Sequence, residues 1–155
     1  GTLGDRFYIE EPDRSSGIQV RCAQPALCSG SLNDIADVEG IMRLVDGEHA
    51  LTLANIAVRE PGTVVKPLGM TIGSAYDIGP STVGLLVTVW GNILDRGDGW
   101  ILIGDGGSQV TIALPPGVAA DPAAQHLIAT GISTVGAGAP HRVIRVRSAA
   151  DLLGY

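Results

Sequence analysis

The sequence predicts an all-β fold built from two copies of one small unit. Its 155 residues include 22 glycines and 9 prolines, a composition that favours short strands separated by turns over helices. An internal repeat supports this, because Asp5–Val20 and Gly99–Ile112 each show a strand pattern, a polar turn and a second strand. The copies are offset by about 90 residues, which is typical of tandem supersecondary units.

The repeat continues beyond these hairpins. Asp37–Met42 matches Leu127–Ser133, each with Gly-Ile at its centre, and Ala50–Ala54 matches Arg142–Val146. Because the matches keep one order and one approximate offset, they indicate two modules of the same design.

One strand of the repeat is missing from the first copy. An evident strand, Leu85–Leu94, precedes the second copy, whereas only Gly1–Gly4 precedes the first. Three explanations stay open at this point: a truncated chain, a smaller open sheet packed on the second copy, or a strand supplied by a neighbouring subunit. The third matters for function, since an unpaired sheet edge is a template for another chain.

These observations divide the chain into three parts. We expect an incomplete first module in residues 1–60, a linker or arm in residues 61–84 and a second module in residues 85–155. The middle part is long for a structureless connection and has only two strand-like stretches, Val64–Val65 and Met70–Ile72.

The first module is predicted to hold four strands in a meander, and the second is predicted to hold five. The first four are Phe7–Ile9, Ile18–Arg21, Val38–Leu44 and His49–Val58. The other five are Leu85–Leu94, Trp100–Gly104, Gln109–Leu114, His126–Thr134 and His141–Arg147, with a short helix expected in residues 115–125. Five strands with a helix between the third and fourth is the layout of an OB fold, a small Greek-key barrel. The prediction is therefore two tandem OB-like barrels, the first without its own first strand.

The charge balance does not favour nucleic acid as a partner. The formal net charge is -6, and the ten basic residues are nine arginines and Lys66. Arg142, Arg145 and Arg147 cluster in one strand, with Arg96 near them by repeat analogy, but a solvated strand face explains them as well. No apolar run approaches the ~20 residues of a spanning helix, so we expect no membrane insertion.

The two cysteines, Cys22 and Cys28, lie six residues apart with Pro25 between them. In an oxidising compartment they would form a disulfide, and two free thiols are the alternative. A structural zinc site needs four ligands, and the nearest histidine in sequence is His49, so none is expected.

Residues with catalytic potential are sparse. The three histidines lie on or beside predicted strands: His49, His126 and His141. No Gly-x-Ser-x-Gly motif surrounds any serine. Asp95, Asp98 and Asp105 are better explained as turn formers than as calcium ligands, because their spacing matches no calcium loop. We therefore expect no catalytic residue, no cofactor and no metal ion.

Aromatic residues offer one structural hint. In the repeat Trp100 aligns with Tyr8, and Phe7 faces the opposite side of the same strand. One ring of the pair would then pack in the core while the other could stack on a ligand, as in OB folds that bind single strands or sugars.

Several segments resemble a known group of domains. Val87–Gly91, Trp100–Ile112 and Ala129–Ile132 are similar to OB-fold modules of large secreted or surface proteins of bacteria. Phe7–Ile18 and Pro67–Met70 are similar to sequence motifs that recur in that group. The resemblance covers nearly the whole chain and implies an extracellular or cell-surface, non-catalytic OB pair.

The missing strand and this resemblance lead to a functional hypothesis. We expect a structural subunit of an extracellular fibre, a homo-oligomer that polymerises head-to-tail into a helical filament by strand donation. The assembly candidates are Phe7, Tyr8, Val64, Val65, Met70 and Ile72. Serine and threonine in the loops leave O-linked glycan open. The alternative is an OB pair that binds single-stranded nucleic acid or glycan within a larger surface protein.

Overall fold

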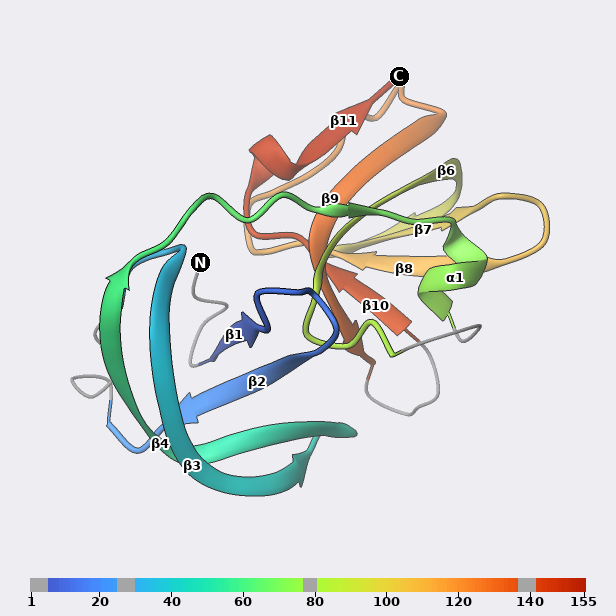
Figure 1. Cartoon of the computed structure of the whole chain (residues 1–155). Coiled ribbons are helices and arrows are strands. Elements are labelled where there is room, and N and C mark those ends of the chain that lie inside the picture. The colour runs from blue at the N-terminus through green and yellow to red at the C-terminus, as the bar shows by residue number, and fades with distance from the viewer. Residues whose placement is uncertain (1–5, 25–29, 77–80, 137–141) are drawn as a thin grey trace.

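The protein is all-β, as the sequence predicts, and its strands form two sheets (Figure 1). The computed structural model describes residues 6–24, 30–76, 81–136 and 142–155. Within these residues, no helix has the length and apolar character needed to cross a membrane.

The first sheet has four strands in the order β1-β2-β4-β3. They are β1 (Phe7–Glu10), β2 (Gly17–Cys22), β3 (Asp34–Val45) and β4 (Glu48–Pro61). The predicted meander is wrong, because β3 does not pair with β2. Instead, β4 lies between β2 and β3 and pairs with β2 in parallel. In the described part of the chain the two edge strands, β1 and β3, do not pair with each other, so this sheet is open.

The second sheet contains a closed barrel. Its strands are β5 (Leu68–Gly69), β6 (Leu86–Gly97), β7 (Trp100–Gly104), β8 (Gln109–Ala113), β9 (His126–Val135), β10 (Arg142–Arg145) and β11 (Leu152–Gly154). The ring β6-β7-β8-β10-β9 closes because β6 pairs with β9 through its first half and with β7 through its second. Parallel pairing of β8 with β10, among otherwise antiparallel neighbours, completes the OB strand order.

Buried and outward-facing side chains alternate along most of these strands, and the buried ones form the barrel core. In β6, Val87 and Val89 are buried, whereas Thr88 is only partly buried and Trp90 is exposed. The same rule buries Ile101 and Ile103 of β7 while their neighbours face outward. Further core residues are Val110, Ile112, Leu127, Ala129 and Ile144.

The helix of the barrel comes from an unexpected segment. The predicted helix in residues 115–125 is wrong, since Pro115-Pro116-Gly117 and Pro122 interrupt that segment, which forms turns. Instead α1 (Ile72–Tyr76), in the arm, inserts the fully buried Ile72 into the barrel core. At Gly91 a Cβ would lie 2.8 Å from the Ile72 Cδ1 atom, so β6 makes room for this helix with a glycine. A 3-10 helix (Ala149–Asp151) precedes β11.

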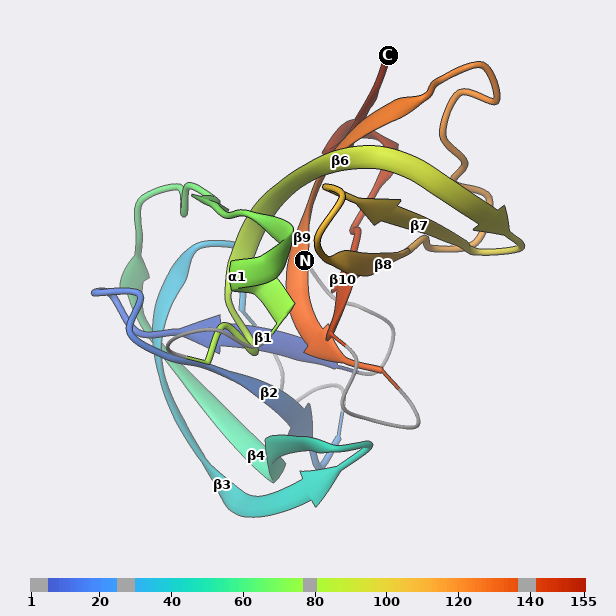
Figure 2. The same cartoon turned by 90° about the vertical axis from the view of Figure 1, so that its right-hand side faces the viewer.

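The first sheet lies on one side of the barrel (Figure 2). Their backbones come close together at two glycines, since a Cβ at Gly17 would lie 2.5 Å from the carbonyl carbon of Gly84. Arg14 donates hydrogen bonds to the carbonyl oxygens of Lys66 and, at 2.9 Å, Leu86. Glu48 accepts one from the backbone N–H of Val135 at 2.6 Å. The two sheets are therefore joined by specific polar contacts.

Candidate ligand-binding face of the barrel

The outer surface of β7, β8 and β10 carries a mixed aromatic, polar and cationic set of side chains. Pairing in register places Trp100, Ala113 and Arg145 in one row across these strands. The next row holds Leu102, Thr111 and Val143. We call these two rows the β7–β8–β10 face.

A shallow hollow of about 390 Å³ adjoins the second row. Its apolar lining comes from Leu102 and Val110, and its polar lining comes from Ser108, Gln109 and Arg142. The turn that precedes β8 is fixed locally, because Asp105 Oδ1 accepts hydrogen bonds from the backbone N–H groups of Gly107 and Ser108 at 3.0 and 2.8 Å. Those bonds hold the pKa of Asp105 below its usual value.

Trp100 lies half-buried at one end of the β7–β8–β10 face. A Cβ at Gly97 would lie only 2.1 Å from the indole Nε1, so the ring packs directly over the backbone of Gly97. Ala113 is the small residue between this ring and Arg145. One strand, β8, separates the strands that carry the ring and the guanidinium, so their backbones lie roughly 10 Å apart.

The four arginines that the sequence groups together have different partners. Arg147 forms a bidentate ion pair with Asp151, donating from Nη2 to Oδ1 at 2.6 Å and from Nε to Oδ2 at 3.0 Å. Arg96 donates to the backbone carbonyls of Asp121, at 2.8 Å, and Ala124. By contrast, Nε of Arg145 is buried and has no hydrogen-bond partner among the described residues. Arg145, on the β7–β8–β10 face, and Arg142, in the lining of the adjoining hollow, are the cluster members beside this surface.

A buried polar network lies beside Arg145, where the two sheets meet. Glu48 Oε2 accepts hydrogen bonds from the Tyr8 hydroxyl at 3.0 Å and from the Gln19 amide at 3.1 Å. Burial, together with the Glu48 charge and hydrogen bond, raises the pKa of Tyr8 to about 12 despite the opposing effects of Gln19 and Arg145. Tyr8 thus belongs to the joint between the sheets.

The remaining predicted residues lie apart from the β7–β8–β10 face. Phe7 is partly buried on the other side of the first sheet, in one row with Val20, Leu51 and Met42. In the arm, Val64 is exposed, Val65 donates its backbone N–H to the Asn33 side chain at 3.3 Å, and Met70 packs against the barrel core.

Cys22 is disulfide-bonded, while Cys28 lies outside the described residues, so their pairing stays a prediction. His49 and His126 are exposed, and His141 lies outside the described residues. Within the parts of the chain that are described, no three His, Cys, Asp or Glu side chains are grouped to hold a metal ion.

Sequence reasoning missed two contributors to this face. Leu102 and Thr111 were treated only as strand residues, although each alternates with a buried isoleucine or valine and so must face outward. Alternation was therefore the signal that could have found them.

Comparisons with known proteins give two partial structural matches. No family model and no curated protein matches the chain. The telomere capping protein Ten1 from Saccharomyces pombe matches with a TM-score of 0.42 and 17% identity over 57% of this chain and 81% of that one. The S. pombe Stn1-Ten1 complex matches with the same two values over 58% and 77%. At this level the likeness transfers neither ligand nor partner to this chain.

These matches nevertheless contradict the function predicted from the sequence. The first is a telomere capping protein and the second is a complex that contains Ten1, and neither is a subunit of an extracellular fibre. We therefore withdraw the head-to-tail homo-oligomeric filament, the extracellular or cell-surface location and the expectation that the charge balance disfavours nucleic acid as a partner. The structure adds a physical reason against a donor arm, because β5 pairs with β6 and Ile72 is buried in the barrel of the same chain.

Proposed function

We propose that this chain is a non-catalytic, ligand-binding OB-fold protein that binds single-stranded nucleic acid across the β7–β8–β10 face. The observation that carries the proposal is the row Trp100–Ala113–Arg145, which sets a ring and a guanidinium on one surface with a small residue between them. Aromatic rings stack on bases without regard to sequence, and guanidinium groups neutralise phosphates.

The position of this row also supports the proposal. In OB folds the second and third strands and the adjoining loops form the usual surface for oligonucleotides. Here those strands are β7 and β8, and Arg142 begins β10 beside them. Because the whole chain has a formal charge of -6, we expect weak binding that depends on these few local cations.

Fluorescence anisotropy with a labelled thymidine decanucleotide tests the proposal. If Arg142 and Arg145 contact two phosphates, the slope of log K against log salt is about -1.4, and Arg142→Ala reduces its magnitude by about 0.7. Trp100→Ala should weaken binding at every salt concentration, by about 1–3 kcal/mol if one base stacks on it. Arg59→Ala is the matched control, because Arg59 is exposed and pairs with Asp37 on the first sheet. Absence of binding at low salt, or equal loss in the control, would refute the proposal.

We further propose that the first sheet is a second OB unit without its first strand. Its order β1-β2-β4-β3 repeats the order β7-β8-β10-β9, and the parallel pair β2–β4 repeats β8–β10. Of the five strands that form the barrel ring, β6 is the one without a counterpart among the described residues. Hydrogen exchange tests the assignment: outward amides of the two edges, β1 and β3, should exchange much faster than those of β6, which has partners on both sides. Equal protection of all three strands would contradict it.

A further inference from the structure

A second surface of the barrel presents aromatic and apolar side chains to solvent. Trp90, Ile128 and Leu153 face each other across β6, β9 and β11. Trp90 and Leu153 are each 54% exposed, although both belong to regular strands. The next row along the same face is Asn92, His126 and Tyr155, with Tyr155 61% exposed. We call these six residues the aromatic platform.

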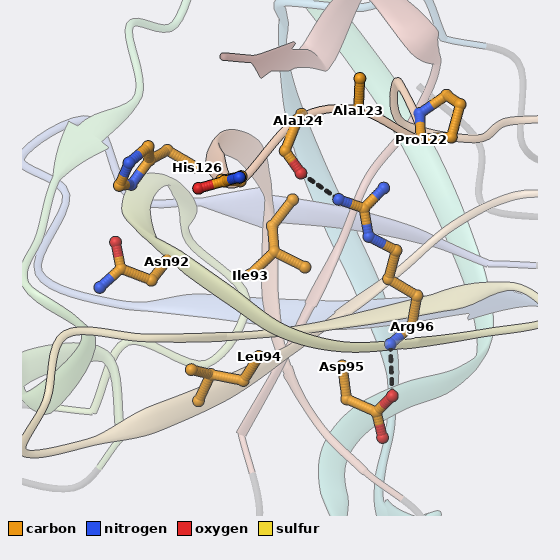
Figure 3. A pocket seen from close by; sticks show the side chains of 10 residues that line it. Asn92, Ile93, Leu94, Asp95, Arg96, Pro122, Ala123, Ala124 and His126 are labelled. Atoms are coloured by element: carbon orange, nitrogen blue, oxygen red, sulfur yellow. Dashed lines mark hydrogen bonds between the residues drawn. The ribbon is translucent and has the colours of Figure 1, made fainter.

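The platform continues into a hollow of about 620 Å³ on the barrel surface (Figure 3). Asn92 and His126 belong to both, and the hollow extends from them along β6 to Arg96. Its opposite wall is held in place, because Ile93 donates its backbone N–H to the carbonyl of Gln125 at 2.8 Å. Arg96 fixes the same wall through Asp121 and Ala124, so the site exists before any ligand arrives.

The electrostatics of this hollow do not suit a polyanion. The guanidinium of Arg96, its one cation, is engaged by the carbonyls of Asp121 and Ala124. Asp95 contributes an exposed carboxylate to the lining. The remaining polar side chains are the amides of Asn92 and Gln125 and the imidazole of His126. Neutral donors and acceptors beside exposed rings match the hydroxyl groups and apolar ring faces of a sugar.

We propose that the aromatic platform and its hollow bind a neutral oligosaccharide of pyranose sugars. The sugar rings stack on Trp90 and Tyr155, and their hydroxyl groups meet Asn92, Gln125 and His126. Trp90 lies on β6 and Tyr155 directly follows β11, two strand positions or roughly 10 Å across the sheet, so the ligand spans more than one ring. This site lies on different strands from the β7–β8–β10 face and stands independently of the nucleic-acid proposal.

Intrinsic fluorescence gives a direct test, because the chain has two tryptophans. In a Trp100→Phe variant the emission reports Trp90 alone. Cellohexaose and chitohexaose are the probes, and we expect at least one to shift this emission saturably. Calorimetry on otherwise native protein should then show that Trp90→Ala or Tyr155→Ala weakens the same sugar about tenfold or more.

Two controls separate this proposal from the preceding one. Trp100→Ala should leave sugar affinity unchanged, and Trp90→Ala should leave binding of the thymidine decanucleotide unchanged. Circular dichroism establishes that both variants are folded, as the exposure of Trp90 leads us to expect. The proposal fails if neither sugar binds, if Trp90→Ala and Tyr155→Ala retain full affinity, or if the decanucleotide shifts Trp90 emission in place of the sugars.

Discussion

The carboxylate of Glu48 shows how a single side chain joins the two sheets. It is 4% exposed, and it accepts from Tyr8 and Gln19 of its own sheet and from the backbone of Val135 in the barrel. A buried carboxylate is costly unless hydrogen bonds surround it. Because these donors come from both sheets, the cost is offset only when the sheets are docked.

The hydroxyl of Tyr8 provides a spectroscopic probe of this joint. Its pKa is raised to about 12, whereas an unfolded tyrosine titrates near 10. The folded protein therefore holds this proton more tightly, so its contribution to stability is complete below about pH 10 and is lost as the pH rises towards 12. In an absorbance titration of tyrosine ionisation, Tyr8→Phe should remove a component that titrates near pH 12. Titration of all tyrosines near 10 in the folded protein would contradict the assignment.

At the scale of elements, the arm between the two sheets becomes part of the barrel. β5 lengthens the sheet beside β6, and α1 fills the core next to Gly91. The burial of Ile72 suggests that this segment contributes to stability in the way a core element does.

Truncation of Ile72 tests that contribution. Ile72→Ala removes a fully buried side chain and should lower the free energy of unfolding by about 2–5 kcal/mol. Val64→Ala in the same arm is the matched control, because Val64 is 76% exposed, and its effect should be within about 0.5 kcal/mol. Urea denaturation followed by circular dichroism measures both. If the two variants were equally stable, α1 would not be a core element.

The local sequence pattern predicted most of the strands, because alternating apolar and polar residues mark a strand and turn residues mark its ends. β7 and β8, for example, follow from Trp100–Gly104, Gln109–Leu114 and the Asp-Gly turn between them. Neither α1 nor the parallel pairing of β2 with β4 could be found in this way. Both depend on contacts between segments far apart in sequence, which outweigh local propensity.

The candidate sites were predictable to a similar degree. Alternation with Val87 and Val89 places Trp90 on the outside, and the arginine cluster pointed to β10. The sequence could not show that Arg96 is engaged by carbonyl groups some 25 residues away. Nor could it show that the side chains of Tyr8 and Glu48 meet, since 40 residues separate them.

For the whole molecule, the question is whether the two sheets unfold together. Their joint rests on Glu48 and on Arg14, whose guanidinium reaches two carbonyls and lies 3.1 Å from Glu10. The Arg14–Glu10 pair is an ion pair without hydrogen-bond geometry, because Arg14 Nε and Glu10 Oε1 have no hydrogen-bond partner among the residues that the structure describes. The directional interactions of Arg14 are therefore its hydrogen bonds to the two carbonyl oxygens.

Removal of both side chains should uncouple the sheets. Glu48→Ala leaves the partly buried donors of Tyr8 and Val135 without this acceptor, at a cost of up to about 1–3 kcal/mol each, and Arg14→Ala removes the bonds to Lys66 and Leu86. Because the barrel has its own closed core and the first sheet is open, the first sheet should unfold at the lower temperature. Calorimetry of the double variant should show two transitions where the parent protein shows one. A paired control, Glu39→Ala with Arg59→Ala, changes exposed residues of β3 and β4 and should keep a single transition. A single unshifted transition in the Arg14 and Glu48 variant would mean that apolar packing, and not this polar joint, couples the sheets.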